Sequence, residues 1–203
     1  MARCWKGPRL ADSLALYLTI TTAAPLVSIP VFILLNSAVA PSSYFVTGIS
    51  VLFAGIIPLL TILVWSRGIR RIAVDIPERS DRPVVLAVMV VSYCAGTVIL
   101  WQLGASWPVT ALMFCYCTNC TIVFFINFFW KISIHAMGIA GPVAALLFTT
   151  PLAGLLLVLL LPPVMWSRVH LGRHSVAQVT AGAVLGFGST ALQFSVLEPL
   201  LSL

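Results

Sequence analysis

The chain has 203 residues, of which 61% are hydrophobic and only 8% are charged, and its formal net charge is +6. Soluble domains carry about 25% charged residues, so this composition cannot supply a water-exposed globular surface. It excludes a soluble enzyme, a disordered tail and a small secreted disulfide scaffold, and it predicts a polytopic membrane protein.

Six apolar stretches reach the length of about 20 residues that a membrane span requires. The fifth is too long for one upright helix, and Pro151 and Gly154 near its middle predict a hairpin of two short helices. We therefore predict an all-α, polytopic transmembrane helical bundle with seven spans, or six as the alternative count. Residues 1–203 would form a single membrane-embedded domain. The stretches cover 14–35, 44–65, 84–103, 107–130, 136–166 and 176–197.

Charge is confined to one set of the predicted links. With seven spans, the amino-terminal segment and the links 66–83, 131–135 and 167–175 meet on one side of the membrane. Together they hold all 11 lysines and arginines and all 3 histidines. The positive-inside rule predicts that this side is cytoplasmic. No charge lies in the middle of a span, which disfavours an ion-coupled transporter.

The segments 66–83, 131–135 and 167–178 form the predicted active-site face. Arginine side chains bind phosphate oxygens in pairs, and two histidines can divide nucleophile and general-acid roles in phosphoryl transfer. A group of arginines and histidines at a bilayer boundary is suited to binding a lipid with an anionic head group and an apolar tail. The cations are Arg82, Lys131, Arg168 and Arg173, and the imidazoles are His135, His170 and His174.

These segments resemble the motifs of the type 2 phosphatidic acid phosphatases, which read K-x6-R-P, P-S-G-H and S-R-x5-H-x3-D. The matches extend over about half of the chain, in the same order as in the family. They comprise Arg82-Pro83 in the first motif, Ser133 and His135 in the second, and Ser167-Arg168 followed by His174 in the third.

The resemblance implies a helical membrane enzyme that removes phosphate through a covalent phosphohistidine. His174 would be the nucleophile, and His135 would protonate the leaving alcohol. Arg82 and Arg168 would hold the phosphoryl oxygens, helped by the amide and hydroxyl of Ser133, and we include Ser167 among the phosphate-binding candidates. The expected substrate is a lipid phosphate or diphosphate, either polyprenyl or similar to phosphatidic acid.

Several positions depart from the family pattern. The lysine of the first motif is Asp75, and Lys131 is a candidate to restore the missing cation. The aspartate that orients the nucleophile is Gln178. A glutamine carbonyl can accept the Nδ1–H of His174 and fix its tautomer, but it cannot stabilise the imidazolium by charge. His170 lies in the same short segment and is a second candidate partner for His174.

Asp75, Glu78 and Asp81 open a second possibility. As a loop they could bind Mg²⁺ together with a diphosphate, which would suit a prenyl-diphosphate lyase, cyclase or transferase. The competing and favoured interpretation is that they neutralise nearby arginines. A third hypothesis is a catalytically degenerate member that binds or moves anionic lipids. For the phosphatase we expect no cofactor, no nucleic-acid partner and a membrane location; the oligomeric state stays open.

Overall fold

The computed structural model describes residues 10–39, 42–66 and 82–201, and within them the chain is helical without strands. Asp75, Glu78 and Asp81 lie outside the described residues. The helices, in chain order, are α1 (Leu10–Thr21), α2 (Ala24–Ala38), α3 (Tyr44–Val51), the π-helical segment η1 (Leu52–Ile56), α4 (Ile57–Trp65), α5 (Arg82–Gln102), α6 (Trp107–Ile126), α7 (Ile134–Thr149), α8 (Pro151–Val158), α9 (Leu161–His170) and α10 (Val176–Leu201).

Prolines mark two of the breaks between these helices. Pro25 lies in the first turn of α2, which is bent by 54° from α1. Pro151 begins α8 directly after Thr150, so the expected break in the 136–166 stretch is present and α7 packs against α8. Proline lacks a backbone N–H and its ring crowds the preceding turn, which explains why the helices end at these points.

Judged by length and composition, the described residues contain five or six candidate spans. Among the described residues, five helical stretches are long and apolar enough to cross a membrane, and the bent pair α1–α2 would make a sixth. The helix α7 is apolar but has only 16 residues, which is short of the roughly 20 residues of a full span. By this test the described residues support up to six spans, and the seventh span stays a prediction.

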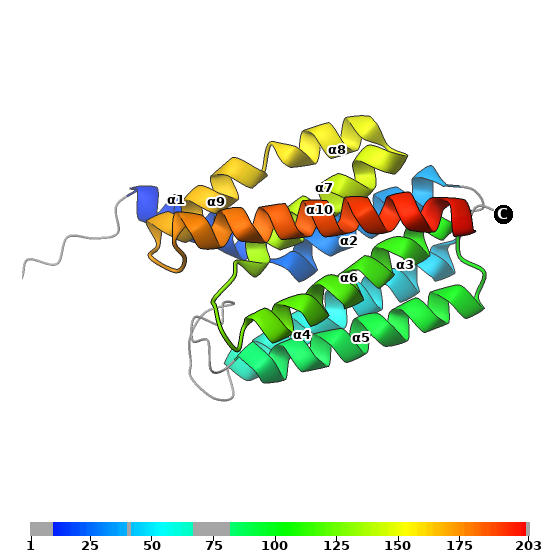
Figure 1. The fold of residues 1–203 in the computed structure, drawn as a ribbon, viewed down its shortest axis with the longest axis horizontal. Helices are drawn as coiled ribbons and strands as arrows, with labels where there is room; N and C mark the ends of the chain where they lie inside the picture. The colour runs from blue at the N-terminus through cyan, green and yellow to red at the C-terminus, as the bar shows by residue number, and fades with distance from the viewer. Residues whose placement is uncertain (1–9, 40–41, 67–81, 202–203) are drawn as a thin grey trace, which may run out of the picture.

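The helices form a bundle in which α7 is largely buried, and α10 packs along α7 and lies in front of it in Figure 1. Close packing there depends on glycine. A Cβ at Gly182 would lie 2.4 Å from the carbonyl oxygen of Ser133, and a Cβ at Gly186 would lie 2.7 Å from that of Met137. Small residues let helix backbones approach closely, and in this chain they bring α10 against the start of α7.

The polar links meet at one end of the bundle. In Figure 1 the start of α10, the end of α9 and the beginning of α1 lie at the left, with the α6–α7 link below them. The turns 103–106 and 149–151 lie at the right, near the carboxyl terminus. The expected gathering of the basic segments is therefore present among the described residues.

Candidate functional site

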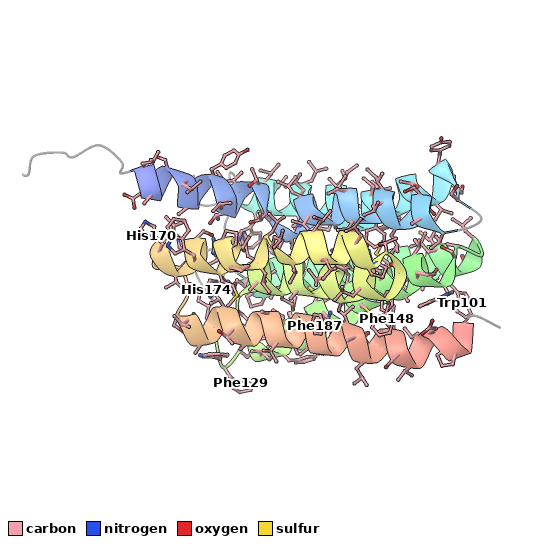
Figure 2. All side chains as sticks on the ribbon, turned by 90° about the horizontal axis from the view of Figure 1, so that it is seen from above. Trp101, Phe129, Phe148, His170, His174 and Phe187 are labelled. Atoms are coloured by element: carbon pink, nitrogen blue, oxygen red, sulfur yellow. The ribbon has the colours of Figure 1, made fainter. Side chains whose placement is uncertain are left out.

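Polar and charged side chains are buried at the left-hand end of the bundle. Figure 2 shows His170 and His174 there, with Trp101 of α5 at the opposite end. Arg168, Ser133 and Ser167 are 0% exposed, Arg82 is 4% exposed and His174 is 6% exposed. Charged groups are rarely buried without partners, so this cluster is a candidate functional site.

The link between α9 and α10 sets the spacing between Arg168 and His174. Helix α9 ends in a Schellman motif, in which Gly172 has a φ of 65° and left-handed backbone is easily adopted by glycine. The amide of Gly172 donates to Val169 O at 2.9 Å, and the amide of Arg173 donates to Arg168 O at 3.0 Å. The amide of His174 also donates to Arg168 O, at 3.2 Å. The five-residue spacing thus holds the backbone of His174 against the last turn of α9.

Helix α10 begins with a capping box formed by Ser175 and Gln178. Ser175 Oγ accepts from the amide of Gln178 at 3.3 Å, and Gln178 Oε1 accepts from the amide of Ser175 at 3.1 Å. The pattern Ser-x-x-Gln satisfies two backbone donors at a helix start. Gln178 therefore has a structural role in addition to any role in chemistry.

The capping box also fixes the tautomer of His174. The Gln178 atom that faces the Ser175 amide must be the carbonyl oxygen, because an amide N–H needs an acceptor. The same Oε1 lies 3.2 Å from His174 Nδ1, so Nδ1 carries the proton and donates. In the neutral ring this leaves Nε2 with its lone pair, which is the state a nucleophilic histidine needs.

Burial lowers the pKa of His174 from 6.5 to about 3, and the positive charges of Arg82, Arg168 and Lys131 act in the same direction. The hydrogen bond to Gln178 works against them. The imidazole is therefore neutral at physiological pH. The three cations act on it from α5, from α9 and from the α6–α7 link, so the structure brings together residues that the sequence analysis assigned to one phosphate site.

The segment 131–135 is tied to the same end of α10. The amide of Ser133 donates to Gln178 O at 3.2 Å, and the hydroxyl of Ser133 caps α7 by accepting from Ala136 N at 3.4 Å. Arg82 Nη1 donates to Ile132 O at 3.1 Å. The amide and hydroxyl of Ser133 therefore serve the backbone in this structure, and their contact with phosphate stays a prediction.

Thr19 of α1 is a site residue that the sequence analysis missed. Its hydroxyl accepts from Arg168 Nη1 at 3.4 Å and lies 3.4 Å from Ser167 Oγ. The hydroxyl of Ser167 donates to Val164 O at 2.8 Å, so its phosphate-binding role also stays a prediction. Thr19 is 4% exposed, and its side chain lies between α1 and α9.

The carbonyl of Thr19 holds His135. Near the bend, the amide of Ala23 bonds to Ile20 O, one residue short of the helical i→i−4 partner. Thr19 O is thereby released from the α1 ladder and lies 3.1 Å from His135 Nε2. Because a carbonyl only accepts, His135 Nε2 must carry a proton. The bend also approaches α7 directly, since a Cβ at Gly138 would lie 2.5 Å from Ala24 Cβ.

His170 does not partner His174, contrary to the second candidate pairing. Its Nε2 lies 2.8 Å from Asp12 Oδ1 of α1, and its ring stacks on Trp166 with centroids 4.9 Å apart. His170 lies one turn beyond Trp166 on α9, which directs it toward α1. It therefore belongs to the α1–α9 contact, and Gln178 is the partner of His174.

The proposed Mg²⁺ ligands Asp75, Glu78 and Asp81 lie outside the described residues. Within the part that the structure describes, no group of three or more histidine, cysteine, aspartate or glutamate side chains is arranged to hold a metal ion. Arg173, the remaining candidate cation, is half-buried in the α9–α10 link. The site that the structure provides consists of His135 and His174 with Arg82, Arg168 and Lys131.

No known protein family matches this chain, and no curated protein or solved structure does so either. The resemblance to the type 2 phosphatidic acid phosphatases therefore depends on the three motifs alone.

Proposed function

We propose that the protein is a membrane-embedded phosphatase that removes phosphate from a lipid phosphate or diphosphate through a phosphohistidine at His174. The observation that carries the proposal is the state of this side chain. It is a buried, neutral imidazole whose Nδ1–H is held by Gln178 and whose surroundings carry three positive charges. Neutral imidazole among cations suits attack on an anionic phosphorus centre.

The reaction needs two histidines with different roles. Nε2 of His174 attacks phosphorus, the bond from phosphorus to the bridging oxygen breaks, and the leaving oxygen takes a proton from His135. A water molecule then gives a proton to His135 and attacks the phosphohistidine. This second step releases inorganic phosphate and restores both rings.

The contact with Thr19 restricts how His135 can act. Its Nε2–H is engaged by the Thr19 carbonyl at 3.1 Å. In this ring orientation the proton for the leaving group has to come from Nδ1 of the imidazolium.

The cations Arg82, Arg168 and Lys131 would bind the phosphoryl oxygens and stabilise the charge that develops as the bond breaks. Arg82 and Arg168 are held by Ile132 O and Thr19 Oγ1 respectively, so the fold positions them before a ligand arrives. With the positive-inside rule, the proposal places this site at the cytoplasmic face.

One observation favours a second candidate, a non-catalytic protein that binds anionic lipids. Gln178 completes the capping box of α10, so its presence requires no catalytic explanation. It also leaves His174 without the negative charge that would stabilise an imidazolium or its phosphorylated form. Such a protein would keep the basic site and bind phosphate without turnover.

Phosphate release from a panel of prenyl and glycerolipid phosphates, with and without EDTA, tests the proposal. We expect turnover that survives EDTA and an acid-labile, alkali-stable phosphoprotein. His174→Ala should abolish both. His170→Ala, the same change in the same segment at a residue outside the site, should retain both.

Each other result has a definite meaning. Turnover abolished by EDTA would favour the Mg²⁺-dependent lyase, cyclase or transferase. Lipid binding without release of phosphate from any substrate would contradict the phosphatase and favour the non-catalytic candidate.

A further inference from the structure

We infer that the cavity inside the bundle, lined in part by Arg82 and His135, binds a single hydrocarbon chain, and that the substrate class is therefore a single-chain phosphate such as a prenyl or monoalkyl phosphate. The phosphate end of this inference depends on the proposed function, whereas the chain site does not. Two-chain lipids similar to phosphatidic acid, which the sequence left open, are thereby disfavoured.

The cavity has a volume of about 90 Å³ and lies between α2, α4, α5, α6, α7 and α10. Its lining is mainly apolar. Polar side chains also line it: Asn119 Nδ2 donates to Thr190 Oγ1 at 3.0 Å, and the buried hydroxyl of Tyr116 has no hydrogen-bond partner among the described residues. Representative lining residues on α5 and α6 are Met89, Tyr93, Leu112 and Cys115. This lining suits hydrocarbon rather than a polar ligand.

Part of the cavity wall belongs to the proposed phosphate site. Arg82 and His135 both line the cavity. The charge of Arg82 also reaches His174, since it contributes to the lowered pKa of that imidazole. A phosphate held by Arg82 beside His174 would therefore have its organic group next to the cavity. The anion would lie among cations and the chain among apolar side chains.

The dimensions of the cavity favour one chain over two. The lining extends along α5 from Arg82 to Tyr93, which corresponds to about 16 Å at 1.5 Å per residue. Since a site for one water takes about 10–15 Å³ by the same measure, the cavity volume corresponds to about six to nine waters, which suits one alkyl chain and not two. At about 90 Å³, this cavity accepts one chain segment in file along its length, and a second chain would have to remain outside.

Binding of n-alkylphosphonates tests the chain site without turnover, because their C–P bond is not hydrolysed by a phosphatase. Cys115 and Cys117 on α6 offer a matched pair of sites. Cys115 lines the cavity, whereas Cys117 does not, and the Cys117 thiol faces Val90 O of α5 at 3.9 Å. Cys115→Leu therefore adds volume inside the cavity, and Cys117→Leu adds the same volume outside it.

We expect Cys115→Leu to weaken binding of decylphosphonate by about tenfold, the equivalent of roughly 1.4 kcal/mol and within the usual cost of overpacking. Butylphosphonate, whose chain fills less of the cavity, should be affected less, and its binding reports that the variant is folded. Cys117→Leu should bind both ligands normally. Partition of decylphosphonate into detergent is common to all variants and cancels in these ratios.

Leu112→Ala supplies a second, opposite perturbation in case Cys115→Leu does not fold. It enlarges the cavity, so the preferred alkyl chain should become longer. An unchanged chain-length preference in either folded variant would overturn the inference, because the chain would then lie outside the cavity.

The single-chain claim is tested with octanoyl lysophosphatidic acid and dioctanoyl phosphatidic acid at equal concentrations. We expect at least about tenfold higher kcat/KM for the single-chain compound, from the volume argument above. Equal kcat/KM would refute it. If alkylphosphonates bind as expected and no phosphate is released from any compound, the chain site stands and the phosphatase proposal fails.

Discussion

Replacing Gln178 with glutamate changes the charge beside His174 and leaves the helix cap in place. A glutamate at this third helical position still accepts from the Ser175 amide, as in the usual capping box. Its carboxylate would take the position that now lies 3.2 Å from His174 Nδ1. The variant therefore keeps the tautomer and adds one negative charge, which is the feature that the phosphatase family has and this chain lacks.

The size of the effect follows from the distance between the charges. Two unit charges about 4 Å apart interact by about 4 kcal/mol at an effective dielectric constant near 20, and one pKa unit corresponds to about 1.4 kcal/mol. The carboxylate should raise the pKa of His174, now about 3, by at most about three units. Because residue 178 is partly exposed, solvent screening should reduce the shift to about two.

The same charge should accelerate the reaction. Replacing the triad aspartate of a serine protease with asparagine costs about 10⁴ in turnover, through the wrong tautomer. In this protein the tautomer is already correct, so only the charge is gained. From a stabilisation equivalent to about two pKa units we expect Gln178→Glu to raise kcat by roughly tenfold to a hundredfold.

The pH dependence of kcat/KM measures both effects. We expect the acid limb in Gln178→Glu to move from near its present value of about 3 to about 5, with a parallel shift in the His174 titration followed by NMR. Ser175→Ala is the control, because it removes the hydroxyl that accepts from the Gln178 amide and leaves the side chain of Gln178 beside His174. An acid limb that stays in place in a folded, active glutamate variant would refute the assignment of Gln178 as the partner of His174.

Three further predictions concern stability and positioning. Gly182→Ala should lower the melting temperature and the activity because its Cβ would meet a backbone carbonyl at 2.4 Å, whereas Gly188→Ala on the same helix, with nothing within 4 Å, should leave the melting temperature unchanged. Thr19→Val should lower kcat/KM by about tenfold through loss of a hydrogen bond to a charged group, here from Arg168; Thr19→Ser should restore most of it, and equal losses in both would contradict the role of the hydroxyl. Because the pKa of His174 is lowered to about 3, its contribution to the free energy of unfolding is fully present above pH 6.5 or so and is lost as the pH falls toward 3, by at most about 1.4 kcal/mol per pH unit. In chemical unfolding, the free energy of unfolding of His174→Asn should depend less on pH in that range than that of the unaltered protein.

The sequence predicted the parts of the fold that depend on local composition. The apolar stretches became helices, the break near Pro151 is present, and the basic links gather at one end. The contact between Gln178 and His174 could be predicted because the two residues are one turn apart on the same chain segment. By length and composition the described residues supply five or six candidate spans, and the seventh span stays a prediction, because α7, with 16 residues, is shorter than a full span.

The sequence did not reveal the contacts that depend on the packing of α1. Thr19 holds His135 through its backbone carbonyl. Because every residue type has a backbone carbonyl, the side chain at position 19 could not predict this contact. The only clue was Pro25, which follows the bend. The pairing of His170 with Asp12 was missed because it joins helices at opposite ends of the sequence. The capping box of Ser175 and Gln178, by contrast, was readable from the spacing and was overlooked in favour of the catalytic role.

The bend between α1 and α2 connects the fold to the proposed chemistry. A straight helix would have used the Thr19 carbonyl internally, and His135 would then need another acceptor to fix its ring. In this structure the same residue also orders Arg168 through its hydroxyl, and the carbonyl of Arg168 in turn accepts from the His174 amide. One residue of α1 therefore links both histidines and Arg168. Because such a site is ordered by the fold rather than by the ligand, little reorganisation would be needed when a phosphate binds.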